Sequence, residues 1–355
     1  MLLALPKYRI KLETFIFPIV GLAAFFVYIF AFNVDLQKII SEIQRIDLPL
    51  YLLAMVTSLL DTLFFSLAWY SLLRFLSVKV RFLKAFLFVW VGIFVDTIIP
   101  AESVSADIAK IYLVNREEAG SAGKATASLV AQRLVGMSLN TATLLAGIVL
   151  LWTQQLLSGM VLNLSLFLVA LTSFSSVLIL LLCSRERWTL LIVDKVIGFV
   201  GWLSRGHWKL DKMRQDVVGA MKAFHCAFRE YAHAPKTLLI TACFSILSWM
   251  SYLSVFYLTF QAIGYPQISW GTILVISAVF GMVKSIPLGI PFDVGLPEIT
   301  ITTLLILFGV PAETSATATI LIRLLTLWLR FFIGVASQQW IGIKELTTST
   351  SNKQR

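Results

Sequence analysis

The chain has 355 residues, of which 58% are hydrophobic and only 14% are charged. This balance excludes an ordinary soluble domain, in which about a quarter of the residues carry a charge. The net charge of +10 does not indicate nucleic-acid binding, because in a membrane protein excess Lys and Arg collect in cytoplasmic loops. The three cysteines are scattered, so neither a disulfide framework nor a zinc site is expected. The composition predicts an all-α polytopic membrane protein that forms a single integral membrane domain over residues 1–355.

Six apolar stretches are long enough to cross a bilayer, which takes about 20 helical residues. We predict these spans at residues 14–32, 49–78, 124–152, 157–183, 237–263 and 315–343. The polar segment 184–236 contains ten Lys or Arg against five Asp or Glu, and its tryptophans suit amphipathic helices on a membrane surface. Because basic segments stay inside, we predict that this segment and both termini are cytoplasmic and that the protein resides in the cell membrane.

Two further apolar regions, residues 85–115 and 268–308, are interrupted by proline. Residues 85–99 would form a helix of only ~22 Å, shorter than the ~30 Å hydrocarbon core. The predicted orientation of the neighbouring spans implies that the first region enters and leaves the membrane on the cytoplasmic side and the second on the outer side. We therefore predict two oppositely inserted re-entrant hairpins with tips near Pro100 and Pro291. The alternative is a bundle of eight complete spans.

After the tip of each interrupted region, a carboxylate is followed by an arginine at nearly the same spacing. Asp107 precedes Arg133 by 26 positions, and Glu298 precedes Arg323 by 25 positions. The flanks are alike, with Ala-Thr-Ala-Ser-Leu-Val-Ala-Gln-Arg-Leu at 125–134 and Ser-Ala-Thr-Ala-Thr-Ile-Leu-Ile-Arg-Leu at 315–324. This pattern predicts an inverted repeat, a design that places transporter sites where the repeats meet.

The two tips resemble the motifs of a known family. Residues 100–113, Pro-Ala-Glu-Ser-Val-Ser-Ala-Asp-Ile-Ala-Lys-Ile-Tyr-Leu, resemble the first motif of the lysylphosphatidylglycerol synthase transmembrane region, a family also described as flippase-like. Residues 291–298, Pro-Phe-Asp-Val-Gly-Leu-Pro-Glu, resemble the second motif, and the resemblance extends over residues 14–343. It implies a membrane protein that acts on lipids, and no soluble aminoacyl-transfer domain is expected.

This chain departs from the family pattern at both tips. Ser105 and Ala106 stand where glycines are common, Asp107 replaces a glutamate and Lys110 replaces an arginine. Phe292 and Asp293 replace paired glycines in the second motif.

Ionisable residues at membrane depth are costly, so they are the first candidates for function. Half-helices that start near the bilayer centre offer free N–H groups and a partial positive charge to a phosphate. We predict that four bases bind an anionic headgroup and that three carboxylates gate or couple its release. The bases are Lys110, Arg133, Arg323 and Arg330, the carboxylates are Asp61, Asp107 and Glu298, and the tips are marked by Pro100, Ser105, Pro291 and Gly295.

Each candidate also has a purely structural interpretation. Asp107 and Lys110 lie three positions apart on one helical face and could form only a structural pair. Arg133 and Arg323 could be interhelical clamps that are satisfied by Asp107 and Glu298. Asp61 could cap a neighbour or face a water-filled cavity, and Arg330 could extend towards the membrane surface.

Three functions fit these features, and none requires a metal or cofactor. The first is a translocase for an anionic phospholipid or a polyprenyl-phosphate-linked sugar, without enzymatic activity of its own. The second is the membrane subunit of a glycosyl- or aminoacyl-transferase that works with a separate soluble or membrane catalytic partner. The third is a secondary transporter for a small solute. The excess of bases and the resemblance to a lipid-related family favour the first.

Overall fold

The computed structural model describes residues 35–99, 104–155, 159–191, 210–284 and 295–353, together with residues 23, 30, 193 and 195. All regular structure in this part of the chain is helical. Five helices are long and apolar enough to cross a membrane: Leu48–Phe75, Ala122–Thr153, Val161–Ser184, Pro235–Ala262 and Ala312–Gly342. They coincide with five of the six predicted spans, and the first predicted span lies almost wholly outside the described residues. The predicted class, an all-α polytopic membrane protein, is confirmed.

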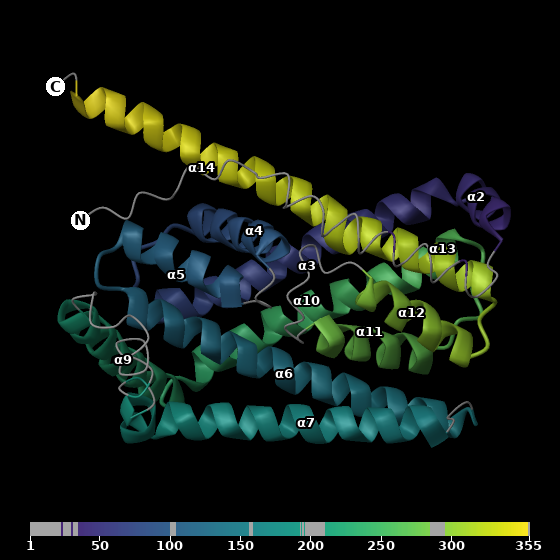
Figure 1. Cartoon of the computed structure of the whole chain (residues 1–355), viewed down its shortest axis with the longest axis horizontal. Helices are drawn as coiled ribbons and strands as arrows, with labels where there is room; N and C mark the ends of the chain where they lie inside the picture. Colours follow the sequence, from purple (N-terminus) through teal and green to yellow (C-terminus); the bar gives the residue numbers. More distant parts are fainter. Residues whose placement is uncertain are drawn as a thin grey trace. The chain divides into compact units, whose positions relative to one another are not determined.

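Figure 1 shows the described helices, coloured in the order of the sequence. They are α2 (Leu36–Gln44), α3 (Leu48–Phe75), α4 (Phe82–Ile98), α5 (Val104–Glu117), α6 (Ala122–Thr153), α7 (Gly159–Ser184), α9 (Leu210–Ala232), α10 (Pro235–Ala262), α11 (Trp270–Lys284), α12 (Leu296–Leu307), α13 (Ala312–Arg323), the π-helix η2 (Leu324–Leu329) and α14 (Arg330–Lys353).

Both interrupted regions form pairs of short helices. The first region consists of α4, with 17 residues, and α5, with 14 residues. The second consists of α11, with 15 residues, and α12, with 12 residues. At about 1.5 Å per residue, each of these helices is shorter than the ~30 Å hydrocarbon core. Pro100 and Pro291 lie outside the described residues, and the re-entrant course of each pair stays a prediction.

The chain divides into two compact units. One comprises Met1–Ser58, Trp90–Ala106 and Leu253–Arg355, and the other comprises Leu59–Val89 and Asp107–Tyr252. We call them the outer-segment unit and the middle-segment unit, after their places in the sequence. The acid and base of one repeat, Glu298 and Arg323, belong to the outer-segment unit, and Asp107 and Arg133 belong to the middle-segment unit.

In the outer-segment unit, α13 packs against α12 and the short amphipathic helix α2. Ile39 of α2 is buried against Ala316 of α13, and the Lys38 ammonium lies 3.1 Å from the Glu313 carboxylate beside them. Figure 1 shows α13, η2 and α14 as one continuous helix. Arg323, the basic residue of this unit's repeat, therefore lies within a helical segment that continues on both sides of it.

In the middle-segment unit, α6 and α7 run side by side and α9 packs against α6 (Figure 1). Buried polar contacts fix α9 in place. His225 Nδ1 lies 2.9 Å from the Cys183 carbonyl oxygen, and the Tyr231 hydroxyl donates to the Leu72 carbonyl at 3.1 Å. Burial raises the pKa of the Tyr231 phenol, so the group stays protonated and keeps donating. The helix α9 is thus anchored to the ends of two spans.

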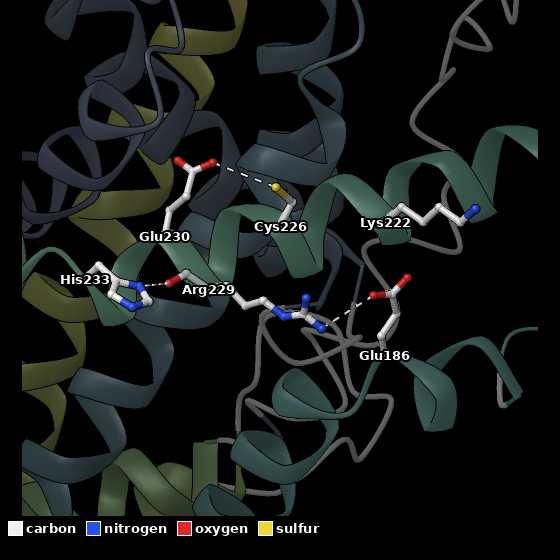
Figure 2. Close-up of a pocket in the computed structure, with 6 residues that line it drawn as sticks. All are labelled: Glu186, Lys222, Cys226, Arg229, Glu230 and His233. Atoms are coloured by element: carbon white, nitrogen blue, oxygen red, sulfur yellow. Dashed lines mark hydrogen bonds and ion pairs between the residues drawn. The ribbon is translucent and has the colours of Figure 1, made fainter.

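The outer face of α9 carries charges of both signs around a cavity of about 280 Å³. Figure 2 shows its six lining residues: Glu186, Lys222, Cys226, Arg229, Glu230 and His233. Arg229 lies 3.7 Å from Glu186 in an exposed ion pair, and the Cys226 thiol lies 3.9 Å from Glu230. Such a balanced, exposed face is typical of a solvated helix surface.

The exposed thiol of Cys226 provides a test of the predicted topology. A variant that retains only this cysteine, with Cys183 and Cys243 replaced by alanine, should react with a membrane-impermeant maleimide in inside-out vesicles and not in intact cells. Gln154→Cys in a chain with all three native cysteines replaced by alanine is the matched control, because residue 154 lies in the exposed turn after α6 and should show the opposite accessibility. Labelling of Cys226 from outside the cell would reverse the predicted orientation.

Candidate functional site

In the middle-segment unit, one carboxylate binds two bases. Asp107, in the first turn of α5, places Oδ1 2.8 Å from the Lys110 ammonium. Its Oδ2 accepts a hydrogen bond from Arg133 of α6, also at 2.8 Å. The Lys110 contact follows from the i, i+3 spacing on one helix, whereas the Arg133 contact joins two helices. We call these three residues the Asp107 cluster.

The two bases of the Asp107 cluster differ in their surroundings. The Lys110 side chain is only 7% exposed, and its ammonium lies over the rings of Phe65 and Trp69 at 5.7 and 5.6 Å. These cation–π contacts and the ion pair hold it in place. The Arg133 side chain is 39% exposed. Arg133 is therefore the base of the cluster that is available to a ligand.

The wall around Lys110 is itself fixed by hydrogen bonds between α3 and α6. Trp69 Nε1 donates to the Ser128 hydroxyl at 2.9 Å, and Gln132 Nε2 donates to the Phe65 carbonyl at 2.8 Å. Gln132 directly precedes Arg133, so its bond to α3 also fixes the backbone from which the exposed guanidinium projects. The cluster is positioned before any ligand arrives, which lowers the entropic cost of binding.

The equivalent pair in the outer-segment unit is buried. Arg323 Nε donates to Glu298 Oε1 at 2.5 Å, and the two side chains are only 4% and 7% exposed. The second Glu298 oxygen accepts the Gly295 N–H at 2.6 Å, so the carboxylate also caps the start of α12. The Arg323 guanidinium lies 5.8 Å from the Phe280 ring. This geometry fits the interhelical clamp better than an open anion site, and a substrate contact for Arg323 stays a prediction.

Side-chain hydrogen bonds hold the described residues beside each helix break. Ser105, in the first turn of α5, donates to Asp96 at 2.7 Å and lies 3.1 Å from the Ile99 carbonyl. Gly295 has φ +109°, a conformation that side-chain-bearing residues rarely adopt, and it is held there by the Glu298 carboxylate. The two breaks thus differ, because Ser105 bonds across the first break, whereas Glu298 caps the start of α12 after the second.

Arg323 and Arg330 are separated by the six-residue π-helix η2. In a regular α-helix, seven positions return to nearly the same face, which would place the two arginines together. A π-helix has wider turns, so this spacing does not apply here. Arg323 contacts Glu298 of α12, whereas Arg330 lies 3.4 Å from the Ser58 hydroxyl of α3.

The third predicted carboxylate, Asp61, is buried in α3. Its Oδ1 accepts a hydrogen bond of 2.5 Å from the Ser248 hydroxyl of α10. The contact fits the predicted capping role, in which the acid joins two spans of the middle-segment unit. Its predicted part in gating or coupling is not addressed by this contact and stays a prediction.

Comparison with known proteins agrees with the motifs at the two breaks. A sequence model of the family described as lysylphosphatidylglycerol synthase TM region matches residues 17–334. The chain belongs to this family. It is similar to a UPF0104 membrane protein of Pyrococcus horikoshii, with 21% identity over 84% of this chain and 89% of the relative. It is also similar to a UPF0104 membrane protein of Methanothermobacter thermautotrophicus, with 23% identity over 86% of this chain and 89% of the relative. No solved structure shows a significant match.

In this member of the lysylphosphatidylglycerol synthase TM region family, an acid follows each break and pairs with the predicted base. Sequence reasoning identified both pairs from their spacing and missed their surroundings. Ser248 and Gln132 could have been noticed as polar residues within apolar spans, where each needs a partner. Phe65 and Trp69 carry no such signal, because aromatic residues are common throughout the chain.

Proposed function

We propose that this protein is a translocase for the anionic headgroup of a phospholipid or a polyprenyl-phosphate-linked sugar, and that Arg133 is its principal headgroup contact. The supporting observation is the exposed guanidinium of Arg133, held by Asp107 within an apolar span. Ionisable residues in that setting are rare and are usually retained for function. The family's description associates it with a lipid-modifying synthase, which supports a lipid as the substrate class.

The Asp107 cluster contains two bases and one acid, so it retains one positive charge. A phosphate diester can take the Arg133 N–H groups that now bind Asp107, while Lys110 keeps the carboxylate occupied. Guanidinium groups suit phosphate because their N–H donors match two of its oxygens at once. In this proposal Asp107 competes with the substrate, which prevents irreversible binding and returns Arg133 to its resting position after release.

The second candidate is the membrane subunit of a lipid-modifying transferase. The word synthase in the family's description favours it, since it suggests a working relationship with a catalytic domain. The two candidates differ in one measurable property, because a translocase moves labelled lipid across a liposome without any added protein. A subunit of a transferase would require its catalytic partner before any lipid changes chemically.

Arg133→Gln should reduce lipid transfer per folded molecule at least roughly ten-fold, because one charge-assisted contact to phosphate is worth about 1.5–3 kcal/mol. The assay uses the full chain reconstituted in liposomes that contain fluorescent phosphatidylglycerol or polyprenyl phosphate. Transfer is followed by quenching from outside. Arg133→Lys should retain part of the activity, because it keeps the charge and loses the paired donors.

Arg229→Gln is the matched control, since it removes an exposed base from the outer face of α9 and should leave transfer unchanged. The midpoint of thermal unfolding of each variant is measured in parallel. Wild-type specific activity in Arg133→Gln would show that Arg133 does not bind the substrate. Absence of transfer by the wild-type chain, with product formed only after a catalytic partner is added, would favour the transferase subunit.

A further inference from the structure

A second cavity in the middle-segment unit, of about 530 Å³, lies between the ends of α3 and α10. Its walls are mainly apolar and include Leu67, Ile240 and Phe244. Both helices belong to the candidate membrane spans. Because both helices are candidate spans, we expect the cavity to face the hydrocarbon of the bilayer, where an acyl chain would fit its walls.

A cation lies at the end of this apolar cavity. Arg74, in the last turn of α3, lines it and is exposed. No ion pair of its guanidinium is found among the residues that the structure describes. Tyr70 lines the cavity one turn earlier on α3, as amphipathic aromatic residues often do at the level of lipid headgroups. The cavity thus changes from apolar to cationic along the direction in which a lipid changes from acyl chain to phosphate.

A contact between α3 and α10 stabilises the cavity. The hydroxyls of Ser71 and Thr241 lie 2.8 Å apart, and Thr241 is fully buried. This bond sets the distance between α3 and α10 at Ser71, which lines the cavity. The cavity is therefore a fixed feature of the middle-segment unit. Lys236, next to the lining residue Thr237 in the first turn of α10, adds a second exposed base nearby in the sequence.

The cavity lies on a different face of α3 from the Asp107 cluster. The lining residues Leu67, Tyr70 and Arg74 follow the i, i+3, i+7 spacing of one helical face. Phe65 and Trp69, whose rings hold Lys110, are four positions apart and lie on the opposite side of the helix. A ligand in this cavity is therefore separated from Arg133 by the body of α3.

We infer that this cavity is a binding site for a resident anionic phospholipid, distinct from the proposed transport site. The phosphate binds the Arg74 guanidinium, the headgroup lies beside the Tyr70 hydroxyl, and one acyl chain follows the wall formed by Ile240 and Phe244. Net negative headgroups are preferred over zwitterionic ones, because Arg74 lines the cavity, Lys236 is exposed next to a lining residue, and a choline would meet both with like charge. The end of α3 that carries Arg74 is the one that the charge pattern predicts to be cytoplasmic, so the lipid belongs to that leaflet.

The test measures lipid binding by the purified full chain, by native mass spectrometry and by the shift of its thermal unfolding midpoint. Dioleoyl-phosphatidylglycerol and dioleoyl-phosphatidylcholine are the two probes. The wild type should bind the anionic lipid at least several-fold more tightly. Arg74→Gln should weaken that binding roughly ten-fold, the factor expected for one charge-assisted contact. Arg74→Lys should stay within a few-fold of the wild type.

Arg81→Gln is the matched control, because Arg81 is an exposed base that follows α3 and does not line the cavity. Ile240→Trp fills the cavity without touching the charge, and it should also displace the lipid. It keeps the inference testable if Arg74→Gln fails to fold. Equal binding of the two lipids by the wild type, or unchanged phosphatidylglycerol binding in both cavity variants, would overturn the inference. Arg133→Gln should bind this lipid normally, so a failed transport site and a failed resident-lipid site give different results.

Discussion

Arg323→Gln is expected to lower the free energy of unfolding by about 3–5 kcal/mol, the usual cost of removing one partner from a buried ion pair. The substitution leaves the Glu298 carboxylate buried, with side-chain exposure of 7%, and without the guanidinium that lies 2.5 Å from it. The Gly295 N–H still binds the other Glu298 oxygen, but a hydrogen bond of that kind offsets only part of the lost charge pairing. The measurement is the thermal unfolding midpoint of the purified protein in one detergent.

Arg133→Gln is the matched control for this experiment, because it makes the same chemical change in the equivalent position of the other repeat. There Asp107 keeps Lys110 as its partner and the lost side chain is half-exposed, so the unfolding midpoint should change little. The double variant Glu298→Gln, Arg323→Gln should be less destabilised than the sum of its single variants, since the buried charges leave together. A midpoint for Arg323→Gln as high as that of Arg133→Gln would show that the buried pair is not a clamp.

Gly123→Ala should destabilise the middle-segment unit by about 1–3 kcal/mol, the range for overpacking a tight contact. A Cβ atom at residue 123 would come within 2.7 Å of Ala223 Cβ and 2.9 Å of the Phe224 amide nitrogen, which are closer than real contacts allow. Part of that contact is backbone, so rotation of a side chain cannot relieve it. The start of α6 and the helix α9 would have to move apart.

Gly136→Ala in the same helix is the control for this variant, because nothing lies within 4 Å of its added Cβ. Removing a glycine from an open helical position should raise stability by about 0.5–1 kcal/mol. The two alanine variants should therefore shift the unfolding midpoint in opposite directions. Faster proteolysis within α9 in Gly123→Ala alone would locate the damage, whereas equal midpoints would mean that the α6–α9 contact is looser than described.

The spans and the helix breaks were predictable because they depend on local properties of the sequence. The length of an apolar run decides whether it can cross a bilayer as a helix. The 17 residues of α4 and the 15 residues of α11 are too few. The pairing of Asp107 with Arg133 and of Glu298 with Arg323 was also predictable, since each acid follows a break and each base follows at nearly the same distance. An isolated charge at that depth needs a partner, and the repeat indicates which one.

The difference in burial between the two pairs could not be read from the sequence. Exposure of Arg133 and burial of Arg323 depend on which helices pack around them, and both lie in similar Ala-Thr-rich stretches. The π-helix η2 was equally hidden, because its residues Leu324–Leu329 fit an ordinary apolar α-helix by composition.

The unequal charges of the two repeats have an electrical consequence. Glu298 and Arg323 cancel, whereas the Asp107 cluster keeps one positive charge near an exposed guanidinium. Displacing one elementary charge through the whole membrane field changes the energy by about 2.3 kcal/mol per 100 mV. A bound phosphate diester cancels that charge, so a loaded cluster would move without work against the field. Movement of an empty cluster would change its energy in the field. A membrane potential that is negative inside would draw the empty cluster towards the cytoplasmic surface.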